Sequence, residues 1–409
     1  MEEARRDILI VGGGPAGMMA GLLFARAGLT VAVLEKHADF FRDFRGDTVH
    51  PSTLELFHQL GMLEELLRLP HSRVDQASIH IAGRAMKVID FAHLPVTAPF
   101  IAMMPQWDLL DFIAGKARQY PGFSLHMESE VVDLVEDEAG RVCGVETRGG
   151  ERLYARLVIA ADGRRSALRD QADLPLRNIG APMDIFWFRV DKPEDYGGDV
   201  FGTVQAGRFM VMIDRRDYYQ CAFVFNKGQA DRVRAAGLEA FRAHLRSLVP
   251  DLAAAFDQIA SWDQVKTLEV ALDRLERWHR PGLLVIGDAA HAMSPIGGVG
   301  INIAVQDAVT AANVLAGPMA RGADPDPLLG DVYRRRIKPV RRMQAFQKLA
   351  QDRVIAPLLR RTRPIEKPFF LLRLLNRVPL LRRIPGRIVG LGFGREDIHS
   401  PEAASPWNG

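Results

Sequence analysis

A glycine-rich turn between a strand and a helix, near the start of the chain, restricts the fold more than any other feature. The apolar run DILIV at residues 7–11 is typical of a buried parallel strand, and GGGPAG follows it directly at residues 12–17. A helix rich in alanine and leucine comes next, and TVAVLEK at residues 30–36 is the second strand. This order predicts a βαβ unit on a parallel sheet, and therefore an α/β domain.

The spacing of Gly12, Gly14 and Gly17 in that turn predicts a pyrophosphate-binding site. Glycine allows a tight turn, and main-chain N–H groups can then reach phosphate oxygens at the positive end of the helix. Glu35 ends the second strand, where a carboxylate can accept hydrogen bonds from both ribose hydroxyls. Because this carboxylate would repel a ribose 2′-phosphate, we expect the bound nucleotide to be FAD or NAD rather than NADP. Arg45 follows shortly after, and its guanidinium suits phosphate oxygens.

Two later strands end in an acid beside a glycine. The run LVIAADG ends in Asp162 and Gly163, and LLVIGD ends in Gly287 and Asp288. An acid at the end of a buried strand is poorly explained as core, and it is well placed to hold a ribityl or ribose hydroxyl. For Asp162 a helix cap is the alternative interpretation.

A glycine-rich loop after the last of these strands leads into a long helix. Pro295, Gly298 and Gly300 shape the loop, and main-chain amides at the helix start, near Ile301, would face an anionic group. A reduced flavin carries negative charge at N1 and the C2 carbonyl, and it suits this position. His291, directly after the strand, is interpreted as a structural histidine rather than a base.

The middle of the chain has a different pattern. Between about residues 180 and 275, aromatic and β-branched runs separated by turn residues predict an antiparallel sheet, with one covering helix near residues 238–260. We expect this sheet to roof the substrate pocket. The candidate lining residues are Trp187, Met210, Met212, Tyr219 and Phe223, and for each of them ordinary sheet core is the favoured alternative.

These patterns predict three parts in a fold of the α/β class, α+β overall. The predicted parts are a discontinuous nucleotide-binding domain at 1–72 with 101–178 and 279–330, a substrate-binding sheet domain at 73–100 with 179–278, and a basic helical C-terminal segment at 331–409.

Charge is distributed unevenly along the chain, whose formal net charge is +3. Residues 331–395 carry 18 Lys or Arg against 3 Asp or Glu, so the remainder of the chain is acidic. A basic tail on an acidic body suits peripheral contact with an anionic membrane. The favoured interpretation is nevertheless a solvated helical segment packed on the body. We expect no nucleic-acid partner.

Cysteine usage and the N-terminal sequence predict a cytoplasmic protein. The two cysteines, Cys143 and Cys221, have neither the spacing of a disulfide framework nor that of a metal site. The first residues carry mixed charge and run directly into a strand, without the pattern of a signal peptide. Because the two cysteines lack metal-site spacing, we also expect no bound metal.

Together the three motifs resemble the fingerprints of the single-component FAD-dependent aromatic hydroxylases, the para-hydroxybenzoate hydroxylase-like class A flavoprotein monooxygenases. The glycine motif at residues 12–17, Asp162 with Gly163, and Gly287 with Asp288 match in order and spacing. The resemblance implies a GR2-type Rossmann-like FAD-binding domain. It also implies FAD as the resident cofactor and NADPH or NADH as a transient reductant.

The resemblance further implies the roles of individual residues. Glu35 would hold the adenosine ribose, Asp288 the ribityl chain, and Pro295 would lie beside the flavin where oxygen reacts. The implied cofactor-binding residues are Gly12, Gly14, Ala16, Gly17, Glu35, Lys36, Arg45, Gln106, Asp162, Gly163, Asp288, Pro295, Gly298, Gly300, Ile301 and Asn302. The implied catalytic residues are Pro295 and Arg45.

The reaction implied by the resemblance is hydroxylation of an aromatic ring, phenolic or polycyclic. NAD(P)H reduces the flavin, O₂ adds at C4a, and the hydroperoxide transfers oxygen to the ring. One alternative is a ubiquinone-biosynthesis-type hydroxylase acting on a membrane-embedded prenylated ring. Others are a reductase or dehydrogenase of the same fold that does not use oxygen, and a non-enzymatic FAD-binding module. We expect a monomer or a homodimer.

Overall fold

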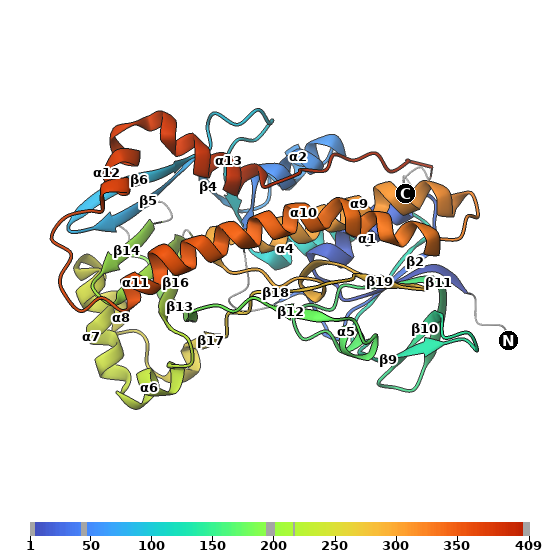
Figure 1. Ribbon diagram of the computed structural model, residues 1–409, viewed down its shortest axis with the longest axis horizontal. Helices are drawn as coiled ribbons and strands as arrows, with labels where there is room; N and C mark the ends of the chain where they lie inside the picture. Colours follow the sequence, from blue (N-terminus) through green and yellow to red (C-terminus); the bar gives the residue numbers. More distant parts are fainter. Residues whose placement is uncertain (1–4, 42–46, 194–200, 216, 404–409) are drawn as a thin grey trace.

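The computed structural model describes residues 5–41, 47–193, 201–215 and 217–403. Two sheets form the two ends of the molecule, and the long helix α10 (Asp326–Ala350) runs from one end to the other (Figure 1). The mixed α/β architecture and the helical C-terminal region follow the prediction.

The first sheet has eight strands and contains the βαβ unit predicted from the glycine-rich turn. Its central strands pair in parallel in the order β20, β11, β1, β2, β8. The strands are β1 (Arg6–Val11), β2 (Val31–Leu34), β8 (Phe123–His126), β9 (Val131–Glu136), β10 (Val142–Thr147), β11 (Arg152–Ala160), β19 (His279–Arg280) and β20 (Leu283–Val285).

Two layers of apolar side chains enclose this sheet. One layer packs the sheet against helices α1 (Pro15–Arg26), α4 (Gln106–Ala117) and α9 (Gly300–Ala320). Alternate residues of β1 point to opposite layers: Ile8 and Ile10 to the helices, Leu9 and Val11 to the other side. All four are at most 5% exposed, which explains why the strand is apolar throughout rather than alternating.

The second sheet has seven strands in the order β17, β13, β16, β15, β14, β5, β6. Its strands are β5 (Gln76–Ile81), β6 (Arg84–Asp90), β13 (Met183–Asp191), β14 (Phe201–Gln205), β15 (Arg208–Asp214), β16 (Tyr218–Asn226) and β17 (Lys266–Leu268). All its pairs are antiparallel except β14 with β5, where the β5–β6 hairpin joins in parallel from a distant part of the chain. The prediction of one covering helix near residues 238–260 is corrected in its extent, because α7 (Leu238–Leu248) ends before Pro250, and a 3-10 turn and a separate short helix follow.

Shorter elements connect the two sheets. The strands are β3 (Thr48–Val49), β4 (Ser72–Val74), β7 (Ile101–Met103), β12 (Leu176–Asn178) and β18 (Asp273–Leu275). The helices are α2 (Pro51–Gln59), α3 (Leu63–Leu66), α5 (Ala167–Gln171), α6 (Ala230–Ala235) and α8 (Ala253–Phe256), with short 3-10 turns at Pro250–Leu252, Trp262–Gln264, Gly287–Ala289 and Ile296–Gly298. Strand β4 pairs with β7 and not with the seven-stranded sheet.

The C-terminal segment packs on both ends of the molecule. Helix α10 continues through a π-helical turn, η5 (Gln351–Ile355), into α11 (Ala356–Leu359). Helix α12 (Phe370–Arg377), the 3-10 turn η6 (Pro379–Arg382) and helix α13 (Arg383–Leu391) then follow over the β5–β6 hairpin (Figure 1). The chain finally returns to α1, where the Ala403 N–H donates to the Arg26 carbonyl.

One helical stretch, Ile296–Ala320, is long and apolar enough to span a membrane by length and composition, with a mean hydropathy of 1.3. However, 78% of that window is buried inside the protein. Because α9 packs on α1 and α10, we interpret it as the core helix of the eight-stranded sheet.

Candidate functional site

Two glycines of the glycine-rich turn lie in close backbone contact, and a third borders open space. A Cβ at Gly17 would lie 1.9 Å from the Gly12 carbonyl oxygen, and one at Gly12 would lie 2.4 Å from the Ala161 carbonyl oxygen. Gly12 also has a φ of +106°. A Cβ at Gly14, in contrast, would meet no atom within 4 Å. Gly12 and Gly17 therefore bring backbones together, whereas Gly14 borders open space at the N-terminus of α1.

Glu35 lies next to this turn at the end of β2, as predicted. Its Oε2 accepts a hydrogen bond from the Gly13 N–H at 2.9 Å, and its Oε1 accepts one from the His37 N–H at 3.1 Å. The residue is 8% exposed, so the carboxylate is held beside the turn rather than in solvent. Lys36, the neighbouring predicted residue, is exposed. Ala16 is buried in α1.

The two other acid–glycine motifs meet at the same edge of the sheet. Arg164 follows Asp162 by two residues and joins the two motifs. Its Nε donates a hydrogen bond to Asp288 Oδ2 at 3.0 Å. Asp162 Oδ1 and Arg164 Nη1 are both buried without a partner among the described residues. Burial also raises the pKa of Asp162. A Cβ at Gly163 would meet nothing within 4 Å. These unpartnered atoms indicate a place for a polar ligand.

Ser166 and Arg169 stabilise this arrangement. The Ser166 hydroxyl accepts from the Arg169 N–H at 3.0 Å and caps α5. The Arg169 guanidinium donates to the carbonyl oxygens of Arg164 and Ala289, at 3.1 and 3.5 Å. The second and third motifs are therefore joined by arginine side chains.

The start of α9 is held by residues 48–53. Asn302 Oδ1 accepts from the His50 N–H at 2.8 Å and from the Thr53 hydroxyl at 2.7 Å, and its Nδ2 donates to the Thr48 carbonyl at 3.2 Å. The side chain of Asn302 therefore fixes the position of this segment. Asn302 is one of the implied cofactor-binding residues, and with its side chain occupied such a contact would fall to its backbone. Ile301 is buried in the core on the helix side of the sheet.

The loop before α9 carries the remaining predicted residues. Pro295 is half-buried, and its carbonyl accepts from the Gly298 N–H at 3.0 Å. Gly298 has a φ of +63° and packs closely on Thr48, whose hydroxyl donates to the Gly298 carbonyl at 2.7 Å. A Cβ at Gly300 would meet nothing within 4 Å. The first amides of α9 therefore border an open space, as those of α1 do at Gly14.

A buried ion cluster behind this loop was not predicted. Asp307 in α9 accepts from His291 Nε2 at 2.6 Å, from Arg336 Nε at 2.8 Å and from the Gly287 N–H at 3.1 Å. All three side chains are at most 2% exposed. Burial opposes ionisation of Asp307, but the charges and hydrogen bonds of His291 and Arg336 outweigh it and lower its pKa. His291 is thus structural, as interpreted. The one signal in the sequence was an acid inside the apolar stretch of α9.

A second unpredicted cluster joins the two ends of the molecule. Asp47 Oδ1 accepts from the N–H of Gln106, the first residue of α4, at 3.2 Å, and its Oδ2 accepts from Arg215 Nη2. Arg215, at the end of β15, also donates to Gln220 Oε1, and its Nη1 is buried without a partner among the described residues. Gln106, one of the implied cofactor-binding residues, is therefore held by Asp47 at the start of α4. No local signal marks Arg215, because only the sheet brings it to Asp47.

The predicted substrate-lining residues lie on opposite faces of the seven-stranded sheet. Met210, Met212, Tyr219 and Phe223 pack against α7 in one apolar cluster. Phe223 also lines a pocket on this face, with a free volume of about 280 Å³, together with residues of α6 and α7. Trp187 lies on the other face, in a cluster that includes Ile296 next to Pro295. The assignment of these four residues to a pocket on the side of Trp187 is therefore corrected, and the alternative of sheet core describes them better, because residues of one strand alternate between faces. Trp187 Nε1 is buried without a partner among the described residues.

Val211, Ala222 and Val224 share the inner face with Trp187. Val211 lies between Met210 and Met212 on β15, and Ala222 and Val224 flank Phe223 on β16. A shift of one residue in the predicted pattern would have selected them.

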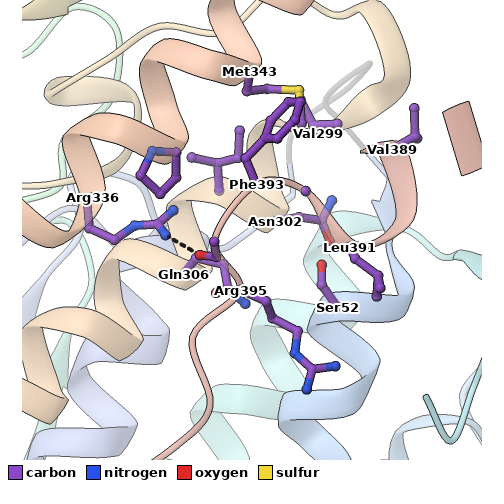
Figure 2. A pocket seen from close by; sticks show the side chains of 14 residues that line it. Ser52, Val299, Asn302, Gln306, Arg336, Met343, Val389, Leu391, Phe393 and Arg395 are labelled. Carbon is purple, nitrogen blue, oxygen red and sulfur yellow. Dashed lines mark hydrogen bonds between the residues drawn. The ribbon is translucent and has the colours of Figure 1, made fainter. Parts of the chain in front are cut away.

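The cavity in Figure 2 is not large enough for an aromatic ring. It lies between α9, α10 and the chain after α13, with Asn302, Arg336, Met343 and Phe393 among its lining residues. Its free volume of about 20 Å³ suits one water molecule. Arg336 also donates to the Gly394 carbonyl there at 3.1 Å. This cavity therefore belongs to the packing behind α9.

The described residues fit FAD. Open positions at Gly14 and Gly300 lie at two helix starts, Glu35 lies beside the first, and Asp162 has an unpartnered buried oxygen. Arg45 lies outside the described residues.

The comparisons with known proteins agree with this geometry. The model of the family described as FAD binding domain matches residues 5–346. The chain is 31% identical over 366 residues to 6-methylpretetramide 4-monooxygenase of Streptomyces rimosus, covering 87% of each protein. It is similar in fold to PqsL of P. aeruginosa, a structure in complex with 2-aminobenzoylacetate, with 19% identity, a TM-score of 0.75, and 87% and 97% of the two chains covered. It is also similar to the Diels-Alderase PyrE3 of pyrroindomycin biosynthesis, with 21% identity, a TM-score of 0.73, and 94% and 80% covered.

Proposed function

The chain belongs to the FAD binding domain family, in the para-hydroxybenzoate hydroxylase-like class of FAD-dependent aromatic monooxygenases, and from this premise we propose its reaction. It hydroxylates a phenolic or polycyclic aromatic substrate with O₂, using NADPH or NADH as reductant. The observation that carries the proposal is the position of Trp187. It brings an unpartnered indole N–H to the sheet face that also meets Ile296, beside Pro295.

FAD would be held along the carboxyl edge of the eight-stranded sheet. The turn at Gly14 would receive the pyrophosphate, Glu35 the adenosine ribose, and Asp162 and Asp288 the hydroxyls of the linking chain. The amides from Gly300 onward would stabilise negative charge on the flavin ring. When bound, FAD supplies the redox chemistry that activates O₂.

The chain's own residues would orient the substrate and exclude water. Trp187 Nε1 and Arg215 Nη1 are the buried donors on the sheet side, and both can donate to oxygens of an aromatic substrate. A donor at a phenolic oxygen stabilises the phenolate, which is the more reactive form. Asp47 would act as a positioning residue, because it fixes Arg215 and the start of α4 together. Pro295 would shape the place where oxygen reacts.

The proposal is tested with purified, FAD-loaded protein. NAD(P)H oxidation, O₂ uptake and H₂O₂ release are measured across a panel of phenols, quinolones and polyketide-like aromatics. We expect at least one compound to stimulate NAD(P)H oxidation and to gain one oxygen atom from ¹⁸O₂, detected by mass spectrometry. Substrate reduction without O₂ uptake would instead support the reductase alternative. A cyclisation product formed without NAD(P)H would support chemistry like that of the Diels-Alderase neighbour.

We further propose the cellular setting and division of the chain. The protein would work in the cytoplasm as a monomer or homodimer, with peripheral contact to a membrane through its basic C-terminal segment. A prenylated ring in that membrane is the alternative substrate class. The predicted domain boundaries are kept, except that the C-terminal segment would begin with α10 at Asp326, because a helix that long forms one unit.

A further inference from the structure

A run of exposed apolar side chains covers α12, η6 and α13. Phe370 is 75% exposed, Leu380 65%, Leu371 60% and Ile384 59%, and Phe369 and Val378 are also exposed. Isolated exposed apolar residues are common, but a run of them on consecutive elements marks an interaction surface. We call these six residues the apolar rim. It lies at the end of the molecule that carries the β5–β6 hairpin (Figure 1).

The apolar rim is not needed for folding against the body, because other side chains fill that role. Leu372 joins an apolar cluster with Ile81 and Met86 of the hairpin. The Asn376 side-chain oxygen accepts from the Lys87 N–H at 3.1 Å. A Cβ at Gly386 would lie 2.0 Å from the Asp90 carbonyl oxygen, so α13 touches β6 through its backbone. The inward faces of both helices are therefore occupied, and the rim points away from them.

Positive charge surrounds the apolar rim. Residues 360–387 contain nine Lys or Arg and a single acidic residue, Glu366. Arg373, Arg377, Arg383 and Arg387 are exposed, and no carboxylate of the described residues forms an ion pair with them. Arginine next to exposed leucine, isoleucine and phenylalanine is the composition of an interfacial helix on an anionic membrane.

Charge complementarity decides between the candidate partners. A second copy would bring the same positive charges against one another, and the repulsion would oppose a symmetric dimer through this surface. An anionic bilayer attracts the arginines and also accepts the apolar side chains at the boundary between headgroups and acyl chains. Both α12 and α13 pack on β6, so their exposed sides belong to one layer of the molecule.

We propose that the apolar rim and its arginines bind reversibly to the surface of an anionic phospholipid bilayer. Phe370, Leu371, Leu380 and Ile384 enter the boundary region, and the arginines contact phosphate groups. This inference deepens the peripheral membrane contact stated under the proposed function, and it does not depend on the identity of the substrate.

The rim is also linked to the candidate site. Val389 in α13 accepts, through its carbonyl oxygen, a hydrogen bond from His50 Nδ1 at 2.8 Å, and the His50 N–H donates to Asn302 at the start of α9. His50 therefore connects α13, which carries part of the rim, to the start of α9.

The test is co-sedimentation of the FAD-loaded full chain with vesicles. Phosphatidylcholine vesicles with and without phosphatidylglycerol are compared, at low and high salt. We expect binding to the anionic vesicles alone, weakened by salt. The double variant Phe370→Ser/Leu371→Ser should bind at least tenfold more weakly. The double variant Arg373→Gln/Arg377→Gln should bind about 30-fold more weakly, at about fivefold for each charge.

Leu349→Ser is the matched control, because Leu349 is 58% exposed on α10 and lies outside the rim. It should bind vesicles as the unmodified chain does. Equal binding to neutral vesicles, no binding to either kind, or unchanged binding by both double variants would overturn the proposal. So would a dimer, seen by analytical ultracentrifugation, that Phe370→Ser/Leu371→Ser abolishes, because a second copy would then be the partner.

Failure of this proposal is distinguishable from failure of the proposed reaction. Flavin absorbance and substrate-stimulated NAD(P)H oxidation are measured for every variant with a water-soluble substrate and no vesicles. Both double variants should keep both properties, because neither changes a residue assigned to the flavin or substrate site.

Discussion

The two sheets of this protein contribute to the candidate site in different ways, one through its edge and the other through a face. The eight-stranded sheet is covered on both faces, and its contribution comes from its carboxyl edge, where backbone turns and three acids converge. The seven-stranded sheet contributes a face. Its outer face closes against α7, while its inner face meets the loop before α9.

This difference explains which parts of the site were predictable. Edge residues follow directly after apolar strands, so a short motif identifies them. The residues that a sheet face contributes to the site are one of two alternating sets of side chains along each strand. When both sets are apolar, the sequence of the strand does not indicate which set points toward the site. Met212 and Val211 are adjacent in sequence but belong to opposite clusters.

The largest expected effect comes from the ion cluster behind the edge. Asp307→Ala should lower the free energy of unfolding by about 3–5 kcal/mol, because it leaves Arg336 as a buried charge without its partner. The measurement is chemical denaturation of the FAD-free protein. A change smaller than about 1 kcal/mol would show that the cluster does not stabilise this edge.

The next effect separates the two faces of the seven-stranded sheet. Met212→Ala should cost about 3 kcal/mol of stability through the cavity it leaves, without changing flavin content or substrate KM. Trp187→Phe should change substrate KM with little loss of flavin. Denaturation and steady-state kinetics measure both. The opposite pattern would return Met212 to the pocket.

Glu35→Ala tests the edge as a cofactor site. The variant loses charge-assisted hydrogen bonds worth about 1.5–3 kcal/mol, which should weaken FAD affinity by about 10- to 150-fold. Affinity is measured by fluorescence titration of the FAD-free protein. The exposed Glu138 offers the control Glu138→Ala, which should bind FAD normally. Full flavin retention by Glu35→Ala would contradict the assignment.

The junction between edge and face should respond to pH. Burial raises the pKa of Asp47 to about 6, against the opposing charge of Arg215 and with a contribution from Asp108. A raised pKa in the folded state means that the folded protein binds this proton more tightly. The contribution of Asp47 to stability is therefore present below about pH 4 and is lost as pH rises through about 6.

Asp47→Asn should remove this part of the pH dependence, although it lowers stability overall by leaving Arg215 unpaired. Denaturation curves between pH 4 and 7 for both proteins provide the test. An identical pH slope in the variant would exclude Asp47 as its source.

The smallest effect is expected at Pro295. Pro295→Ala should leave FAD content nearly unchanged, because the proline contributes shape rather than a hydrogen bond to the cofactor. It should increase H₂O₂ release per NAD(P)H oxidised. Unchanged coupling, with product and peroxide quantified together, would remove Pro295 from the place where oxygen reacts.

Much of the edge was predictable from the sequence because its information is local. Positions 12 and 17 require glycine, because a Cβ at either one would collide with a backbone carbonyl oxygen, of Ala161 and of Gly12 respectively. The position of Glu35 follows from the length of one βαβ unit. His291 was correctly interpreted as structural, but its partner Arg336 lies on α10, and no spacing rule connects the two.

The sequence by itself determined the parallel sheet, the three strand-end motifs and the basic C-terminal segment, since each depends on residue type and short-range order. Only the tertiary structure decided which face of the second sheet points inward, and that Asp47 meets Arg215. It also decided that the apolar side chains of α12 and α13 stay exposed. These outcomes depend on which surfaces pack together. Contacts between residues far apart in the chain cannot be predicted from the local pattern of residue types.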